Sequence, residues 1–257
     1  MTRGAWNPDQ YLRFRAERSR PFFDLLALVA PCPGGRAADL GCGTGELTPA
    51  LHRATGAAET VGIDNSETML AKSAAHAGDG VRFELANIET FEPRDPLDVV
   101  FSNAALHWVD DHRALFSRLA AMLKEGGQLA VQVPANHGHP SHTVADEVAC
   151  EEPFASALGG YRRGVPVEEP EWYAGLFDSL GFREQSVRLQ VYVHHLPARA
   201  DVIEWTRGTL LTDYEKRLAP GLFEAFLVRY RERLLPLLSE AEPFYYPFKR
   251  ILMWARK

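Results

Sequence analysis

The sequence predicts an α/β fold in which a doubly wound, mostly parallel sheet is flanked by helices. Short apolar segments alternate with helical ones from about residue 36 to 133, the order that parallel strands with crossover helices require. The first apolar segment also ends in three closely spaced glycines, Gly41, Gly43 and Gly45, directly before a helical segment. A glycine turn at that point is typical of a sheet that binds a nucleotide.

Five strands and the helices between them form the predicted core. The strands are expected at Arg36–Leu40, Thr60–Ile63, Val81–Leu85, Leu97–Ser102 and Gln128–Val133. The helices are expected at Glu46–Thr55, after a cap at Ser66, and from Asp110 or Asp111 through Leu123 to a stop at Gly126–Gly127.

The segments on either side of the core have a different pattern. An amphipathic helical region is expected over 8–30, and two further strands at Ser186–His194 and Phe248–Ala255. Helices are expected at Thr143–Cys150, Glu171–Leu180, Ala200–Leu211 and Leu222–Leu235. We therefore expect a single domain over 1–257, with a helical lid (1–30), a cofactor-binding core (31–135), and a substrate-side cap with the last strands (136–257).

Composition excludes several classes of protein. A formal net charge of −6 argues against a general nucleic-acid or membrane-surface binder, because both need excess positive charge. Three scattered cysteines are too few for a disulfide framework. No segment has the apolar character of a signal peptide or a membrane span. We therefore expect a cytoplasmic protein, a monomer with no nucleic-acid or membrane partner.

The glycine turn has the spacing G-x-G-x-G after Asp39, and Glu46 stands where a dinucleotide fingerprint needs its third glycine. Glycines let a ligand approach the backbone, and the following helix offers free N–H groups. Tight packing of strand on helix is the alternative explanation of such a turn. The spacing favours a nucleotide-like ligand other than a nicotinamide dinucleotide.

Polar side chains also follow the next three strands. Asp64 ends the second strand, where a carboxylate can accept hydrogen bonds from two ribose hydroxyls, although it can equally cap the next helix. Asn87 follows the third strand and Asn103 the fourth. The carboxyl ends of parallel strands share one edge of the sheet, so these groups are expected around one crevice.

The segment Asp39-Leu-Gly-Cys-Gly-Thr-Gly45 resembles the first motif of the class I S-adenosylmethionine-dependent methyltransferases, which have a Rossmann-like sheet. The resemblance implies S-adenosylmethionine as cofactor and S-adenosylhomocysteine as product. It implies that Gly41 contacts the methionine part and Asp64 the ribose. The cofactor-binding residues implied in all are Asp39, Gly41, Gly43, Asp64, Asn65, Asn87, Ile88 and Asn103.

A narrower resemblance extends along nearly the whole chain. Trp6-Asn-Pro8, Glu17-Arg-Ser-Arg-Pro21, Phe101-Ser-Asn-Ala-Ala-Leu-His-Trp108, Tyr192-Val-His194 and Glu204-Trp205 resemble blocks of the trans-aconitate methyltransferase family. His107 stands where that family often has Gln. The resemblance implies O-methylation of a carboxylate of a small polycarboxylic acid, giving a monomethyl ester, with trans-aconitate as the expected acid.

Carboxylate chemistry sets the catalytic requirements. The acceptor is ionised at neutral pH, so no general base is needed, and positioning supplies the rate. The other carboxylates need cationic partners, and the guanidinium fork of arginine pairs with a carboxylate at two points. We expect Tyr11, Arg18 and Asn103 to position the reactants. The expected substrate-binding residues are Tyr11, Arg18, His107, Tyr192, His194 and Arg250.

Other readings stay open. The arginines can be solvated surface residues, and His194, Tyr192 and Trp205 can be packing residues. His137, His139 and His142 lack a nearby carboxylate or thiolate at ligand spacing, so no metal is expected. A different small O- or N-acceptor with a high pKa would need a base, for which His107 or His194 would serve. A nicotinamide oxidoreductase and a non-catalytic cofactor-binding protein remain the alternatives outside this class.

Overall fold

The computed structural model describes residues 19–161, 163–208 and 210–257. Its first half alternates strands and helices: β1 (Arg36–Leu40), α2 (Thr48–Thr55), β2 (Glu59–Asp64), α3 (Glu67–Ser73), β3 (Val81–Leu85), β4 (Leu97–Asn103), α4 (His112–Met122) and β5 (Leu123–Pro134). The second half contains α5 (Pro140–Val148), α6 (Phe154–Ala157), α7 (Pro170–Ser179), β6 (Glu184–Leu196), α8 (Asp201–Arg207), α9 (Thr212–Glu215), α10 (Pro220–Leu234) and β7 (Phe244–Arg256).

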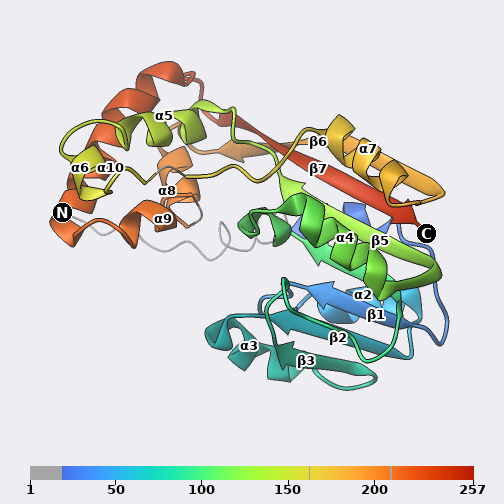
Figure 1. Ribbon diagram of the computed structural model, residues 1–257. Coiled ribbons are helices and arrows are strands. Elements are labelled where there is room, and N and C mark those ends of the chain that lie inside the picture. Colours follow the sequence, from blue (N-terminus) through green and yellow to red (C-terminus); the bar gives the residue numbers. More distant parts are fainter. Residues whose placement is uncertain (1–18, 162, 209) are drawn as a thin grey trace. The chain divides into compact units, whose positions relative to one another are not determined.

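The strands form one sheet in the order β3-β2-β1-β4-β5-β7-β6. The pairs β1–β2, β2–β3, β1–β4 and β4–β5 are parallel, which confirms the predicted fold class. Strand order reverses between β1 and β4, so their carboxyl ends border the crevice where this kind of sheet binds its ligands. Figure 1 shows α4 in front of this part of the sheet and α2 behind it.

Local sequence explains the helix starts. The Ser66 side chain caps α3 by accepting a hydrogen bond from the Met69 N–H, and Asp111 caps α4 in the same way through Ala114 N–H. In α2, a proline occupies the first turn, where its missing N–H leaves no hydrogen bond unmade. Strand β1 is buried at its last four positions, as a strand covered on both faces requires.

The expected end of the helix before β5 was wrong. Leu123 adopts an extended conformation and opens β5, so α4 ends at Met122. Leu123 pairs with Leu97, and a register shift separates that pair from Val99–Gln128. A leucine fits the apolar face of either a helix or a strand, so its position in the apolar pattern could not distinguish the two.

The chain divides into two compact units. The first comprises Met1–Val133, Pro166–Gln190 and Ile251–Lys257, and the second comprises Pro134–Val165 and Val191–Arg250. In the second unit α5, α8, α9 and α10 form a helical cluster (Figure 1). Its core contains the stacked rings of Tyr214 and Phe226, with centroids 5.0 Å apart. No helix within the described residues is long and apolar enough to cross a membrane.

Candidate cofactor site

Three of the predicted polar residues sit at the ends of neighbouring parallel strands. Asp39 is the penultimate residue of β1, Asp64 the last of β2, and Asn103 the last of β4. Because β1 pairs with both β2 and β4, all three side chains lie at one edge of the sheet. The prediction that these residues share one edge is therefore met by the strand pairing.

The glycine turn leaves open space at only its central glycine. A Cβ on Gly41 would lie 2.2 Å from the Ala105 Cβ, and one on Gly45 would lie 2.5 Å from the Phe83 ring. At Gly43 the backbone is left-handed, with φ +58°, yet no atom of the described residues lies within 4 Å of the Cβ position. Packing thus explains two of the glycines, whereas Gly43 borders a space that a side chain would fill.

Asp64 ties the turn to the end of β2. Its Oδ2 accepts the Gly43 N–H at 2.9 Å, and its Oδ1 accepts the Ser66 N–H at 2.9 Å. Each carboxylate oxygen can accept a second hydrogen bond. Asp64 therefore serves as a local backbone anchor and keeps acceptor capacity for a ligand hydroxyl. The alternative role as helix cap falls to Ser66, the N-cap of α3.

Asp39 is a buried carboxylate below the turn. It is 4% exposed, and its Oδ2 accepts the Thr48 hydroxyl hydrogen at 2.6 Å. Burial raises the pKa of Asp39 to about 6, and the nearby Asp64 adds to the rise, while the Thr48 hydrogen bond opposes it. A cation bound in the crevice would favour the ionised form of this carboxyl.

Replacing Asp39 with Asn is expected to stabilise the folded protein at alkaline pH. The pKa of Asp39 is raised from 3.8 to about 6 on folding, so its contribution to stability is complete below about pH 4 and lost as pH rises through about 6. Asn does not ionise and can still accept the Thr48 hydrogen. Urea unfolding at pH 8 should show a gain of roughly 1–3 kcal/mol. A gain at pH 5 as large as that at pH 8 would contradict this cause.

Asn103 supplies an acceptor that nothing in the described chain uses. Its Oδ1 is buried and has no hydrogen-bond partner among the described residues. Asn103 lines a cleft of about 120 Å³ together with Asp39, Gly41, Cys42, Thr44, Glu46 and Leu47 from the turn and Ser19 and Phe22 from the helical residues 19–26. Buried polar atoms are nearly always paired, so this Oδ1 atom is available to accept a hydrogen bond from a ligand.

The remaining predicted cofactor residues lie beside the turn or point elsewhere. Ile88 approaches the turn, with its Cδ1 3.5 Å from the position of a Cβ on Gly41. Asn87 is exposed; its Oδ1 accepts the Glu89 N–H at 2.9 Å and its Nδ2 donates to Glu89 Oε2 at 3.5 Å. Asn65 is exposed between Asp64 and Ser66. The roles of Asn65, Asn87 and Ile88 in cofactor binding stay predictions.

The expected site residues did not include six that also line the cleft: Ser19, Phe22, Cys42, Thr44, Glu46 and Leu47. The expected placement of the N-terminal helical segment over the crevice was the available signal for Ser19 and Phe22. Phe22 packs against Phe101 of β4, with ring centroids 4.9 Å apart. A buried aromatic contact of this kind holds the helical residues 19–26 against the sheet.

The predicted substrate residues fall into three groups. Tyr11 and Arg18 lie outside the described residues. His107 belongs to the short 3₁₀ turn Leu106–Trp108 that follows β4, with its ring 4.8 Å from that of Trp108. The other three, Tyr192, His194 and Arg250, belong to the second unit.

Within the second unit, Tyr192, His194 and Arg250 gather around buried aromatic rings. The Arg250 guanidinium lies 4.8 Å from the Phe248 ring centroid and 5.9 Å from that of Tyr192, and the residue is 8% exposed. His194 packs on Trp205, with ring centroids 4.5 Å apart. Aromatic faces hold a guanidinium in one orientation, so Arg250 is a preorganised buried cation.

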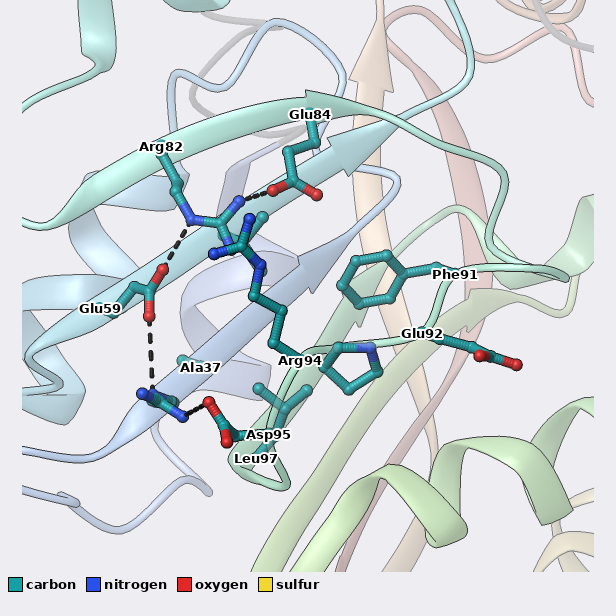
Figure 2. A pocket seen from close by; sticks show the side chains of 12 residues that line it. Ala37, Glu59, Arg82, Glu84, Phe91, Glu92, Arg94, Asp95 and Leu97 are labelled. Carbon is teal, nitrogen blue, oxygen red and sulfur yellow. Dashed lines mark hydrogen bonds and ion pairs between the residues drawn. The ribbon is translucent and has the colours of Figure 1, made fainter.

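A larger cavity, of about 630 Å³, lies where β1 and β2 begin, away from the glycine turn. Several of its charged side chains are paired with one another: Figure 2 shows Arg82 paired with Glu59 and Glu84, and Arg36 pairs with Asp95 and Glu59. The hydrogen bond from Arg82 is the main cause of the lowered pKa of Glu59. Sheets of this topology bind ligands at the carboxyl ends of the strands, so the smaller cleft is the candidate site despite its size.

Among the described residues, no group of three His, Cys, Asp or Glu side chains is placed to hold a metal ion. Thiol chemistry is also disfavoured in the cleft. Burial and the two carboxylates, Asp39 and Asp64, raise the pKa of the Cys42 thiol, so the thiol stays protonated and is a poor nucleophile. The cleft offers a ligand the negative charge of Asp39 and the hydrogen-bond acceptor of Asn103.

Comparison with solved structures agrees with the observed fold. The chain superimposes on a phosphoethanolamine N-methyltransferase of Haemonchus contortus, solved with S-adenosylhomocysteine, with a TM-score of 0.56 and 18% identity, covering 93% of this chain and 52% of that one. It superimposes on a geranyl diphosphate C-methyltransferase of Streptomyces coelicolor with a TM-score of 0.54 and 18% identity, covering 95% of this chain and 79% of the other. At these identities the likeness concerns the fold.

Comparison of sequences is more specific. Residues 37–127 match the family model described as a methyltransferase domain. A trans-aconitate 2-methyltransferase of Deinococcus radiodurans is 42% identical over 98% of both chains. One of Variovorax paradoxus is 39% identical over 98% of this chain and 95% of the other. At such identity over nearly the full length, the resemblance drawn from the sequence is confirmed: the chain belongs to the trans-aconitate 2-methyltransferase family of class I methyltransferases.

Proposed function

We propose that the protein transfers a methyl group from S-adenosylmethionine to one carboxylate of a small polycarboxylic acid, with trans-aconitate as the acid and a monomethyl ester as product. The observation that carries the cofactor assignment is the cleft beside Gly43, with the buried Oδ1 of Asn103 on its wall, for which the described residues supply no hydrogen-bond partner. The names of the near relatives support the choice of acid.

Residues that line the cleft, together with the adjoining pair Gly43 and Asp64, fit the charge of this cofactor. S-adenosylmethionine carries a sulfonium and an ammonium, which suit the carboxylates of Asp39 and Asp64 and the Asn103 oxygen. Its ribose hydroxyls match the spare acceptor sites of Asp64, and its methionine end suits the open backbone at Gly43. When bound, S-adenosylmethionine supplies an electrophilic methyl group. The chain's own task is to orient the acid and exclude water.

The acid requires cations rather than a base. Its carboxylate oxygen is ionised at neutral pH and attacks the methyl carbon directly, so the oxygen–carbon bond forms as the carbon–sulfur bond breaks. Arg250, stacked between rings and buried, is proposed to pair with a second carboxylate. Tyr192 and His194 are proposed as its neighbours in substrate binding, and Tyr11, Arg18 and His107 as further contacts.

The pH dependence of the rate tests the class of acceptor. With saturating cofactor and trans-aconitate, kcat is expected to stay flat from roughly pH 7 to pH 9, because the carboxylate is ionised throughout. An amine or phenol acceptor would instead show a rate that climbs steeply with pH. The measurement is steady-state turnover on a panel of di- and tricarboxylic acids, with small amines and phenols beside them. Turnover confined to the amines or phenols would refute the proposal.

Replacing Arg250 with Lys is expected to raise the KM for the acid by about tenfold or more, because the charge stays but the two-point fork is lost. The dissociation constant for S-adenosylhomocysteine should change by less than about twofold. Arg199→Lys is the matched control, since Arg199 bonds the Leu235 and Leu238 carbonyls of the same unit. If acid kinetics are unaltered in Arg250→Lys, the role passes to Arg18, for which the same substitution gives the same test.

A further inference from the structure

The turn that follows β4 is held in an unfavourable backbone conformation beside the cofactor cleft. Ala104 has φ +56°, a left-handed conformation that costs a residue with a Cβ some strain. This conformation brings the Ala105 Cβ to within 2.2 Å of the Cβ position at Gly41. Ala104 also follows directly after Asn103, whose side chain lines the cleft. Strain at this point requires other contacts to hold the turn.

Those contacts come from a buried chain of hydrogen bonds. His112 Nε2 lies 3.0 Å from the Leu106 carbonyl oxygen, and His112 Nδ1 lies 2.5 Å from the Tyr173 hydroxyl. The Glu168 N–H donates to the same hydroxyl at 3.1 Å. Leu106 and Tyr173 are 0% exposed and His112 is 3% exposed, so water does not compete for these bonds.

The chemistry of the partners sets the direction of every bond. The Leu106 carbonyl can only accept, so the proton of the imidazole is on Nε2 and Nδ1 is an acceptor. Tyr173 therefore donates its hydroxyl hydrogen to Nδ1 and accepts the Glu168 N–H with its oxygen. Burial, the largest cause, lowers the pKa of His112, in agreement with a neutral ring. Only this arrangement gives every donor and acceptor in this series of hydrogen bonds a partner.

The chain of bonds joins the turn to two helices. His112 is the first residue of α4, and Tyr173 lies in the first turn of α7. The Phe116 ring packs 5.7 Å from His112 and 5.4 Å from Tyr173, which holds both side chains laterally. The Leu106 carbonyl also accepts the Val109 N–H at 3.0 Å, so the 3₁₀ turn is fixed at the carbonyl that closes it.

We propose that His112 and Tyr173 are positioning residues, which hold the Asn103–Leu106 turn so that the Asn103 side chain and Ala105 keep their places at the cofactor cleft. This inference rests on the proposed function only in identifying the ligand of the cleft. Neither side chain lines the cleft. Their effect passes through the Leu106 carbonyl to the turn that contains the left-handed Ala104.

Two substitutions at His112 separate positioning from packing. In His112→Gln the side-chain amide reaches the position of Nε2 and can donate to the Leu106 carbonyl. In His112→Asn the amide reaches only the position of Nδ1. The dissociation constant for S-adenosylhomocysteine is expected to rise about tenfold or more in His112→Asn and to stay within about threefold of the parent in His112→Gln. Calorimetry well below each melting temperature measures it.

A role limited to stability would lower the melting temperature of both variants and leave the two dissociation constants alike. Equal affinities in folded Gln and Asn variants would therefore overturn the proposal. Should neither variant fold, Tyr173→Phe, which keeps the ring, replaces them: it is expected to weaken binding by about threefold or more, and unchanged binding would overturn the proposal.

A spectroscopic readout is independent of activity. In the unsubstituted protein, nitrogen-15 NMR of the histidine rings is expected to show His112 as the neutral Nε2–H tautomer at pH 6 and pH 8. A protonated ring at pH 6, or the Nδ1–H tautomer, would contradict the bond directions. If no acid is methylated while binding still follows this pattern, the proposed function fails and the positioning role stands.

Discussion

Gly43→Ala is expected to weaken binding of S-adenosylhomocysteine by at least about 30-fold, the equivalent of roughly 2 kcal/mol. The added Cβ would stand in space that no atom of the described chain occupies within 4 Å, and we assign that space to the cofactor. Strain contributes separately, because the backbone at Gly43 is left-handed. If the turn bound no ligand, Gly43→Ala would lower the stability of the protein alone. If the turn binds the cofactor, the substitution also lowers the affinity for it.

Gly34→Ala is the matched control for Gly43→Ala. Gly34 has φ +73° and likewise nothing within 4 Å of its Cβ position, but it lies in the exposed turn before β1. Both variants should lose about 1 kcal/mol of stability from the left-handed conformation. Only Gly43→Ala should lose affinity in calorimetry. Equal affinities in the two variants would show that the turn is structural.

Asp64→Ala is expected to weaken cofactor binding by roughly 10- to 100-fold, which corresponds to about 1–3 kcal/mol for charged hydrogen bonds. Two causes combine: the ribose loses its acceptor, and the Gly43 N–H loses the bond that orients the turn. Asp64→Asn keeps one acceptor oxygen and loses the charge, so its affinity should be intermediate.

The control for Asp64 is Asp111→Ala. Asp111 also accepts a backbone N–H beside a helix start, that of Ala114 at 2.9 Å, and does not line the cleft. Asp64 differs from it by accepting the N–H of Gly43 in the glycine turn. Loss of the Asp111 carboxylate should therefore lower stability by about 1 kcal/mol and leave calorimetric affinity unchanged. A folded Asp64→Ala protein with the parent affinity would remove Asp64 from the cofactor site.

The sequence predicted the sheet well because its signals are local. Arg36–Leu40 and Val81–Leu85 were expected as strands and are strands over the same residues. The glycine turn ends the first, and the second alternates apolar with charged residues directly after Gly80. Asp111 was one of two expected caps and proved to be the one used. The helical segment predicted at Ala200–Leu211 instead ends at Arg207, and α9 follows at Thr212, because apolar periodicity continues through the break.

The candidate site was predictable in position and not in its interactions. The glycine turn and the carboxylates at the strand ends can be recognised from a few consecutive residues. The Thr48 hydroxyl on Asp39 and the contact of His112 with Tyr173, 61 residues away, arise only when separate elements pack. The raised pKa of Asp39 has the same origin, because burial rather than a neighbour in sequence causes it. For Tyr11 and Arg18, the sequence remains the only basis of the prediction.

The most direct test of the proposed chemistry is to incubate the protein with S-adenosylmethionine labelled at the methyl carbon and with trans-aconitate, and to follow the label by NMR and mass spectrometry. We expect one labelled methyl ester for each S-adenosylhomocysteine formed, with a faster rate for the tricarboxylate than for acids lacking the additional carboxylates. S-adenosylhomocysteine formed with no labelled ester, or no turnover of any carboxylic acid by protein that binds the cofactor, would contradict the account.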